Sequence, residues 1–191
     1  MIVLASASPR RREILELLRV PFSVIPSDVD ETMAAGEGAL AYAARIARAK
    51  AAEIAARHTP ETFVLGADTV VVVDDEVLGK PQSDVDACAM ISRLAGRWHQ
   101  VATAVCLVHG ARVAEELTVT TRVRFRALEP EAIARYVASG EGRDKAGAYA
   151  AQGLGAGLVA EIEGSFFNVI GLPAAETVDL LVRAGALARW P

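Results

Sequence analysis

The sequence predicts an α/β protein, because short apolar runs typical of buried strands alternate with segments of helical periodicity. The clearest strand is Phe63 to Val73, whose near-continuous apolar character is typical of a central strand buried on both faces. The clearest helix is the alanine-rich segment from Ala39 to Arg57. At 191 residues and 52% hydrophobic content, the chain, 1–191, suits either one domain or two lobes that share a core.

The first helix begins beside a concentration of positive charge. Met1 to Ala5 is expected to be a strand, and Ser8 followed by Pro9 is a strong helix start. Three arginines, 10–12, crowd the first turn, where each cation costs about 0.3–1 kcal/mol unless an anion answers it. A Ser-rich loop between a strand and a helix is a ready anion site, so we expect polyphosphate to bind here. The apolar face of this helix is expected to consist of Ile14, Leu15, Leu17 and Leu18.

Two polar features follow whose roles the sequence leaves open. After an expected strand from Pro21 to Ile25, the acidic loop 27–32 is either a solvated connector or a carboxylate source for a divalent metal. In helix 39–57, Lys50 lies on the apolar stripe, four residues from an isoleucine on either side. Its ammonium either extends to the rim or points into a cleft and meets a phosphate.

Asp68 and Thr69 interrupt the long apolar strand. A carboxylate in such a strand is costly to bury unless it is paired, hydrogen-bonded or bound to a cation. Gly66 permits a bulge or the close approach of a ligand. Asp68 could instead cap a nearby turn, but we favour a functional role.

The second half of the chain carries weaker signals. Lys80 lies between a glycine and a proline, so a stiff loop presents it, although this is not a Walker loop. Three alternating arginines, at 122, 124 and 126, indicate a half-exposed strand or else a basic binding stripe. Three glycines, at 153, 155 and 157, do not open a helix after a strand, so they are expected to let backbone pass close to a ligand or a partner strand. The remaining expected elements are helices from Ser83 to Leu94 and from Pro130 to Ala138, strands from Val101 to Val108, Leu117 to Phe125, Leu158 to Ile162 and Phe167 to Ile170, and a terminal helix from Pro173 with Val178, Leu181 and Val182 inward.

Composition excludes several classes of function. A net charge of −4 argues against duplex DNA as a partner. No apolar run approaches the roughly 20 residues of a membrane span, and no basic leader precedes the first strand, so we expect a cytoplasmic protein. The two cysteines, Cys88 and Cys106, form no motif and are expected to be small buried hydrophobes in a reducing compartment. The three histidines lack zinc-like spacing.

The polar residues together indicate phosphoanhydride hydrolysis. Cations neutralise phosphate charge and stabilise a leaving pyrophosphate, while one or two carboxylates hold Mg²⁺ and orient or deprotonate water. The candidates are an anion site at Ser6, Arg10 and Arg11, lysines at Lys50 and Lys80, and carboxylates at Asp68 and Glu31.

Five short blocks follow one another along the chain: Ser6-Ala7-Ser8-Pro9-Arg10-Arg11, Gly66-Ala67-Asp68-Thr69-Val70-Val71, Gly79-Lys80-Pro81, Asp144-Lys145-Ala146-Gly147-Ala148-Tyr149 and Gln152-Gly153. Each block is a weak signal alone, but their order across the whole chain is specific. In this order the chain resembles the Maf family of nucleoside triphosphate pyrophosphatases.

The resemblance implies a fold like that of inosine triphosphate pyrophosphatases, with a long mixed sheet, helices forming two lobes around a central cleft, and often a homodimer. It implies hydrolysis of a nucleoside triphosphate to the monophosphate and pyrophosphate with a divalent cation, Mg²⁺, Mn²⁺ or Co²⁺. Together with the net charge and the absence of a long apolar run, this leads us to expect neither nucleic acid nor a membrane as a partner. The implied roles are proton acceptor for Asp68, polyphosphate binding for Ser6, Arg11, Lys50 and Lys80, metal binding for Glu31 with Asp68, and an additional cleft position for Lys145.

Three positions, Arg10, Thr69 and Gln152, match those that mark the branch of the family acting on dTTP and UTP. The 7-methyl-GTP branch differs there, typically with Trp for the first arginine and Glu for the glutamine. The leading hypothesis is therefore a nucleotide-pool house-cleaning enzyme for pyrimidine triphosphates. The alternatives are a 7-methyl-GTP pyrophosphatase and a nucleotide-binding regulator of septum formation or cell division.

Overall fold

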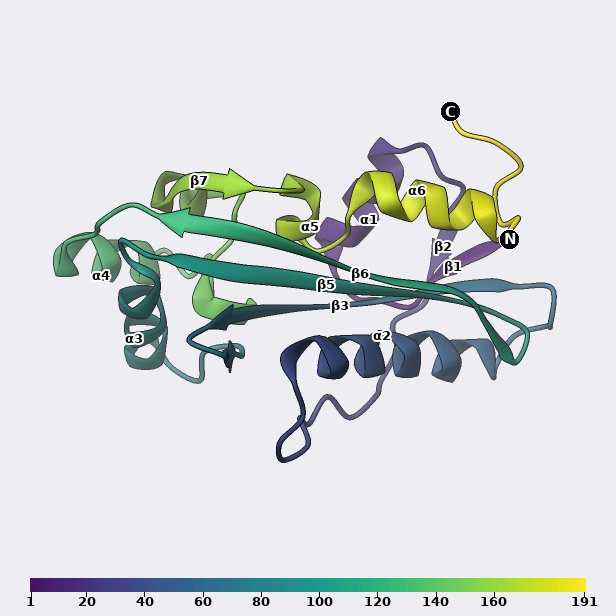
Figure 1. Ribbon diagram of the computed structural model, residues 1–191, viewed down its shortest axis with the longest axis horizontal. Helices are drawn as coiled ribbons and strands as arrows, with labels where there is room; N and C mark the ends of the chain where they lie inside the picture. The colour runs from purple at the N-terminus through teal and green to yellow at the C-terminus, as the bar shows by residue number, and fades with distance from the viewer. The chain divides into compact units, whose positions relative to one another are not determined.

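The computed structural model describes residues 1–191 and contains a mixed sheet flanked by helices (Figure 1). The strand order is β2-β1-β3-β5-β6-β7, with β4 paired to β3. The strands are β1 Ile2–Leu4, β2 Phe22–Val24, β3 Phe63–Val73, β4 Glu76–Leu78, β5 Trp98–His109, β6 Arg112–Phe125 and β7 Val159–Glu163. The helices are α1 Pro9–Leu17, α2 Ala39–Ala55, α3 Asp84–Leu94, α4 Pro130–Ala138, α5 Phe166–Ile170 and α6 Ala174–Arg183, with short 3₁₀ helices at Ala146–Ala148 and Gly153–Leu158. The predicted α/β class is confirmed.

The strand register shows why the sheet is mixed. β1 pairs in parallel with β2 and with the start of β3, placing Leu4 opposite Leu65. β3 and β4 form an antiparallel hairpin, and β6 pairs antiparallel with β7. β5 and β6 are neighbours joined by two residues, a connection that serves antiparallel strands. As predicted, β3 lies inside the sheet and is buried along most of its length.

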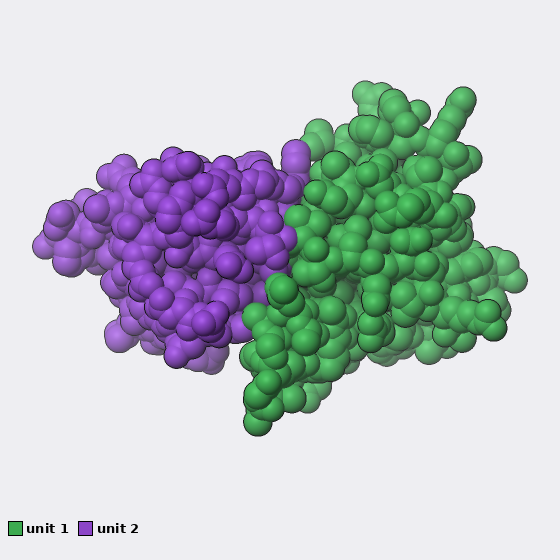
Figure 2. Space-filling view, in the orientation of Figure 1, with its two compact units in different colours: residues 1–68, 103–119, 171–191 green, residues 69–102, 120–170 purple.

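The chain divides into two compact units (Figure 2). Unit 1 consists of residues 1–68, 103–119 and 171–191, and unit 2 of residues 69–102 and 120–170. The long strands β3, β5 and β6 each contribute residues to both units. The expectation that 1–191 is a single domain with a central cleft stays a prediction.

Each unit has its own apolar interior. In unit 1, the fully buried large side chains come from β1, α1, α2, β3, β5 and α6 and from Leu172, just before α6. In unit 2, residues of α3 and α4 form a cluster with side chains of β3, β5 and β6. Phe125 contributes to this cluster with its ring edge-on to Tyr149. These interiors fix the strands and helices that carry the polar residues discussed below.

The N-terminal helix starts as predicted, with one difference in its cap. Ser8 is the N-cap and Pro9 the first helical residue, but the Ser8 hydroxyl makes no capping hydrogen bond. The Ser6 hydroxyl instead accepts the Ser8 N–H at 3.2 Å. Arg12 forms an ion pair with Glu16 one turn along the exposed face of α1. Of the three arginines, it is therefore the one with an ordinary surface role.

Two side chains expected to face inward are exposed, Leu17 at 66% and Val182 at 37%. Successive helical residues turn by about 100°, which places each of these side chains roughly 110° from the centre of its buried face. Ile14 and Leu15 are buried in α1, and Val178 and Leu181 in α6, as predicted.

The predicted strand from Phe167 to Ile170 is wrong, because Phe166–Ile170 forms helix α5. The Ser165 hydroxyl accepts the Asn168 N–H at 3.2 Å, a capping contact that favours a helical turn. Asn168 then donates to the Val101 carbonyl at 2.9 Å and to Thr121 at 3.0 Å, which anchors the turn to two strands. An apolar run of this length fits either structure, and the cap decides between them.

The alternating arginines of β6 form a half-exposed strand with acidic partners. Arg122 pairs with Glu163 and Arg124 with Glu161 across the β6–β7 ladder. Arg122 also lies over the Trp98 ring, 4.4 Å from its centroid. Because carboxylates already answer this charge, the structure favours the half-exposed strand over a basic binding stripe.

The two cysteines and two of the histidines lie where their packing or hydrogen bonding accounts for them. Cys88 and Cys106 are free, and burial raises the pKa of the Cys106 thiol to about 11. His109 stacks on Phe63 with the ring centroids 4.0 Å apart. His99 is 3% exposed and shares a hydrogen bond of 2.8 Å with the Tyr149 hydroxyl. None of the helices is long and apolar enough to cross a bilayer.

Candidate active site

The central contact of unit 1 joins α2 to β3 at Gly66. A side chain at this position would place its Cβ 2.2 Å from the Ala47 carbonyl oxygen and 2.8 Å from the Ala51 nitrogen. Only glycine permits this approach of helix backbone to strand. The close approach expected at Gly66 is therefore to α2, not to a ligand. The same turn of α2 contains Lys50, which contacts Asp68 two residues along the strand.

Lys50 and Asp68 form a buried ion pair. The Lys50 Nζ lies 2.8 Å from Asp68 Oδ1, and the two residues are each 7% exposed. Of the three conditions under which this carboxylate can be buried, the structure shows pairing with a cation, and Lys50 does not extend to the rim. Asp68 lies within a strand, which contradicts the alternative in which it caps a turn.

The same ammonium contacts a second carboxylate. Lys50 Nζ lies 2.7 Å from Oε1 of Glu31, whose side chain is 44% exposed. The acidic loop is therefore more than a solvated connector, because one of its carboxylates reaches the buried pair. Two carboxylates that converge on one cation position form an anionic cluster with a built-in lysine counter-ion.

Residues that the sequence analysis did not single out hold the acidic loop in place. The Tyr42 hydroxyl donates to the Glu31 carbonyl at 2.8 Å. Arg45 donates to the Thr32 carbonyl at 3.1 Å and pairs with Glu37 at 2.7 Å. Partial burial, followed by the nearby carboxylates of Asp68 and Glu31, raises the pKa of Tyr42 to about 12. The signal in the sequence was the helical spacing of Tyr42 and Arg45 on α2, but only the fold shows that this face meets the loop.

Arg11 is the buried member of the predicted anion site. Its Nη1 donates to the Ser6 hydroxyl at 3.1 Å and its Nε to the Gly171 carbonyl at 2.9 Å. Burial lowers the pKa of the Arg11 guanidinium, and the negative charge of Asp68 opposes that shift. Arg10 is half-buried in the same first turn. The first turn of α1 has no acidic residue, so its positive potential is not answered from within that turn.

The carboxylates of Glu31 and Asp68 suit a divalent metal that is shared with a substrate. Mg²⁺ commonly binds through one or two carboxylates together with phosphate oxygens and water. The convergence of both carboxylates on Lys50 Nζ shows that they can serve one cation. No group of three or more His, Cys, Asp or Glu side chains forms a self-sufficient metal site. The donor set therefore fits a metal that depends on a phosphate ligand.

Unit 2 carries the other predicted residues. Thr69 follows Asp68 on β3, and Lys80 is exposed in the loop after β4. The carbonyl of Gly79 accepts the Gly147 N–H at 3.0 Å, so the Lys80 loop lies against the segment that contains Lys145. Lys145 Nζ donates to the Glu141 carbonyl at 2.6 Å.

Gln152 has a polar atom without a protein partner. Its Oε1 is buried and makes no hydrogen bond. A buried acceptor without a hydrogen bond costs about 1–3 kcal/mol, so this oxygen is suited to accept a hydrogen bond from an N–H group of a ligand.

The three glycines that follow Gln152 differ in how closely other atoms approach them. A Cβ at Gly153 would lie 2.2 Å from Glu141 Oε1, and one at Gly155 would lie 2.0 Å from the Ala150 carbonyl oxygen. Gly157 has no such neighbour. Gly153 and Gly155 therefore permit the close approach of atoms of the same unit, where the sequence predicts a ligand or a partner strand.

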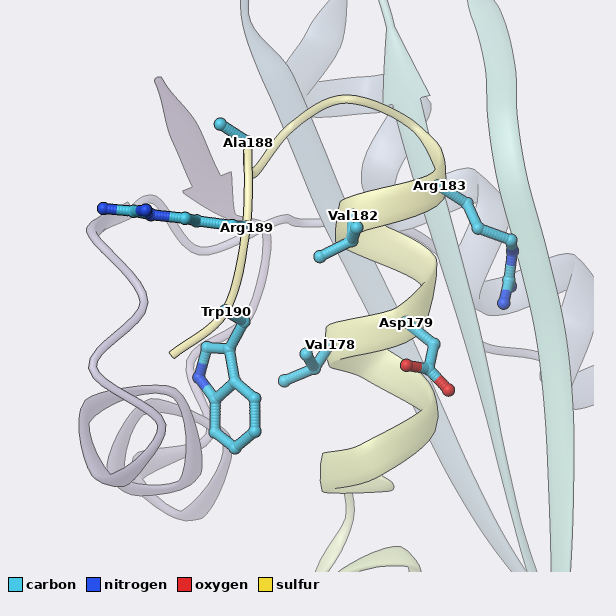
Figure 3. A pocket seen from close by; sticks show the side chains of 7 residues that line it. All are labelled: Val178, Asp179, Val182, Arg183, Ala188, Arg189 and Trp190. Atoms are coloured by element: carbon cyan, nitrogen blue, oxygen red, sulfur yellow. The ribbon is translucent and has the colours of Figure 1, made fainter.

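A hollow of about 450 Å³ in unit 1 lies apart from these residues (Figure 3). Trp190 leans over Val178 and Val182 of α6 and donates its indole N–H to the Leu18 carbonyl at 2.8 Å. None of the residues that line the hollow is among the predicted site residues; they are Val178, Asp179, Val182, Arg183, Ala188, Arg189 and Trp190.

A strand carboxylate is paired with a helix lysine, and a buried arginine lies at a helix start in the same unit, an arrangement that is chemically suited to a phosphorylated ligand. Comparison with known proteins agrees with this class: residues 1–184 match the family described as Maf-like protein. The chain belongs to the Maf family.

It is 54% identical over 190 residues to the dTTP/UTP pyrophosphatase of Myxococcus xanthus, covering 100% of this chain and 95% of that protein. It is 50% identical to the enzyme of the same name from Alcanivorax borkumensis, covering 95% of this chain and 94% of that protein. Among solved structures, a HAM1 protein from Coxiella burnetii matches at 21% identity with a TM-score of 0.44, covering 65% of this chain and 72% of that chain.

Proposed function

We propose that this protein hydrolyses dTTP and UTP, with modified pyrimidine triphosphates, to the monophosphate and pyrophosphate. The observation that carries the proposal is the buried Lys50–Asp68 pair with Glu31 at its open side, in a Maf-family chain. Relatives that align over nearly the whole chain at about half identity are named dTTP/UTP pyrophosphatases. Removal of damaged or surplus nucleotides is the corresponding role.

Asp68 is the proposed proton acceptor. When a polyphosphate offers Lys50 another anion, the ammonium is shared with phosphate oxygens and the Asp68 carboxylate becomes available to water. Asp68 takes a proton as the water oxygen bonds to phosphorus, and the phosphoanhydride bond to the leaving pyrophosphate breaks. Ser6, Arg11 and Lys50 bind and neutralise the polyphosphate, and Lys80 joins this set through its family motif. Glu31 and Asp68 would hold a divalent cation, which when bound supplies further charge neutralisation.

Base preference is assigned to three residues. The buried Gln152 Oε1 lacks a donor, and the N3–H of thymine or uracil is a donor flanked by carbonyl acceptors. The Gln152 amide can therefore accept from N3–H while its NH₂ donates to a neighbouring carbonyl. Arg10 and Thr69 complete the specificity set through their motif positions. A Glu at position 152 would instead suit a methylated, cationic guanine.

The decisive experiment measures pyrophosphate release from a panel of nucleoside triphosphates with Mg²⁺, Mn²⁺ and Co²⁺. We expect dTTP and UTP to be the best substrates and EDTA to abolish turnover. Asp68→Asn is expected to lower kcat by at least about 100-fold while nucleotide binding is kept. Full turnover by Asp68→Asn would overturn the assignment of the base, and binding without turnover by the wild type would favour a regulator.

We place the enzyme in the cytoplasm, where the nucleotide pool is found, and expect a homodimer. Family membership is the basis for both expectations, and the two free cysteines fit a reducing compartment. Light scattering after size-exclusion chromatography tests the dimer, and cell fractionation tests the location.

A further inference from the structure

Glu141, which has no part in the proposed chemistry, makes an unusual set of hydrogen bonds in unit 2. Its Oε1 accepts the Leu154 N–H at 2.8 Å and its Oε2 accepts the Gly155 N–H at 2.8 Å. Oε2 also accepts the Tyr136 hydroxyl at 3.1 Å. One half-buried carboxylate therefore holds the backbone immediately after Gln152.

The backbone before Gln152 is held by the same network. The Tyr136 hydroxyl accepts the Ala150 N–H at 3.1 Å while it donates to Glu141. Burial raises the pKa of Tyr136, which keeps the hydroxyl protonated and able to donate. Residues 150, 154 and 155 are thus tied to one tyrosine–carboxylate pair, and Gln152 lies between them.

The geometry leaves little freedom around this pair. Gly153 has φ +77° and would place a Cβ 2.2 Å from Glu141 Oε1, and a Cβ at Gly155 would lie 2.9 Å from the Tyr136 hydroxyl. The backbone is in contact with the carboxylate and the hydroxyl, without intervening side chains. Hydrogen bonds from backbone N–H groups to a charged acceptor are stronger than neutral ones, so the segment 150–155 is rigidly held.

We infer that Glu141, together with Tyr136, is a positioning residue for base selectivity: it fixes the Gln152 amide in the orientation that a pyrimidine requires. The inference rests on the proposed role of Gln152. Glu141 does not touch the nucleotide, and its effect passes through the 150–155 backbone. It should therefore govern discrimination between bases and leave the chemical step largely unchanged.

The test is a double-mutant cycle of Glu141→Gln and Gln152→Ala. Glutamine keeps the shape of Glu141 but offers one acceptor to two backbone N–H groups. We expect Glu141→Gln to reduce the ratio of kcat/KM for dTTP over dGTP about tenfold, through KM, with kcat within about twofold. In the Gln152→Ala background, the same substitution should change the ratio less than twofold.

Equilibrium affinities for α,β-methylene analogues of dTTP and dGTP, measured by calorimetry, give the same cycle without hydrolysis. If the two substitutions are coupled in these affinities but no triphosphate is hydrolysed, the inference is supported and the proposed function is refuted. If triphosphates are hydrolysed but the effects of the two substitutions are additive, the proposed function is supported and the inference is refuted. An equal fall in kcat for all substrates would also overturn the inference, because it would indicate general loss of structure.

Two further variants guard against misfolding. Tyr136→Phe removes the Ala150 contact and one hydrogen bond to Glu141 while leaving the Leu154 and Gly155 contacts, so a smaller loss of discrimination, about threefold, is expected. Arg143→Gln is the matched control, because Arg143 is two residues from Glu141 and only forms an exposed pair with Asp84. Unchanged discrimination in Tyr136→Phe, or an equal loss in Arg143→Gln, would contradict the assignment.

Discussion

Lys50 is the residue on which the site of unit 1 depends. Its ammonium lies 2.8 Å from Asp68 and 2.7 Å from Glu31, and its stem is buried on the apolar stripe of α2. The stripe position could be predicted from helical spacing, but not its partners. Whether such a lysine reaches solvent or a carboxylate depends on what lies opposite, and that is set by strand β3, thirteen or more residues away in the sequence.

Removal of Lys50 should lower the free energy of unfolding, because the Asp68 carboxylate would remain buried. Lys50→Ala leaves Asp68 without its cation, and breaking a buried pair in this way typically costs about 3–5 kcal/mol. The urea-unfolding free energy should fall by that order. Asp68→Ala combined with Lys50→Ala should cost less than the sum of the single changes, because neither charge is then left alone. Additive losses would show that the pair contributes no coupling energy.

At the scale of elements, most of the fold could be predicted because local pattern and tertiary structure agree. Ser83 illustrates this: its hydroxyl accepts the Asp86 N–H at 3.1 Å and begins α3 where the sequence predicts. The errors arise where pattern underdetermines structure. The run 166–170 is too short for its periodicity to separate helix from strand, and Leu17 is apolar although it lies outside the buried face of α1. The role of Gly66 depended on a helix approaching from another part of the chain, which no local pattern encodes.

The contact between α2 and β3 makes its own prediction. Gly66→Ala would force a Cβ to within 2.2 Å of the Ala47 carbonyl oxygen, so α2 must move away from the strand. We expect a loss of about 1–3 kcal/mol in unfolding free energy, as for other overpacked interiors, and a lower kcat because Lys50 shifts from Asp68.

Gly157→Ala is the matched control for this change, since a Cβ there meets nothing within 4 Å. Its stability and its turnover should equal those of the wild type. A Gly66→Ala variant with native stability and full activity would show that the close packing of α2 is not required.

At the scale of the whole molecule, the free energy of unfolding should depend on pH in part through one histidine, His99. Burial lowers the pKa of His99 from 6.5 to about 4 in the folded state, and its Nδ1 is buried without a partner that could accept a proton. The unfolded chain therefore binds a proton between about pH 6.5 and pH 4 that the folded chain does not. The contribution of His99 to the free energy of unfolding is fully present above pH 6.5. It falls by about 1.4 kcal/mol for each pH unit as the pH is lowered toward 4.

His99→Phe should remove that contribution while it loses the hydrogen bond to Tyr149. We expect the variant to be less stable at pH 7.5 and to lose stability less steeply on acidification, because it lacks the buried imidazole that must remain neutral between about pH 6.5 and pH 4. Urea unfolding at several pH values from 7.5 to 4.5 measures both effects, and His109→Gln, at an exposed position, serves as the control. A pH dependence identical in His99→Phe and wild type would assign the acid sensitivity to carboxylates instead, since paired carboxylates lose stability as they protonate over a lower pH range.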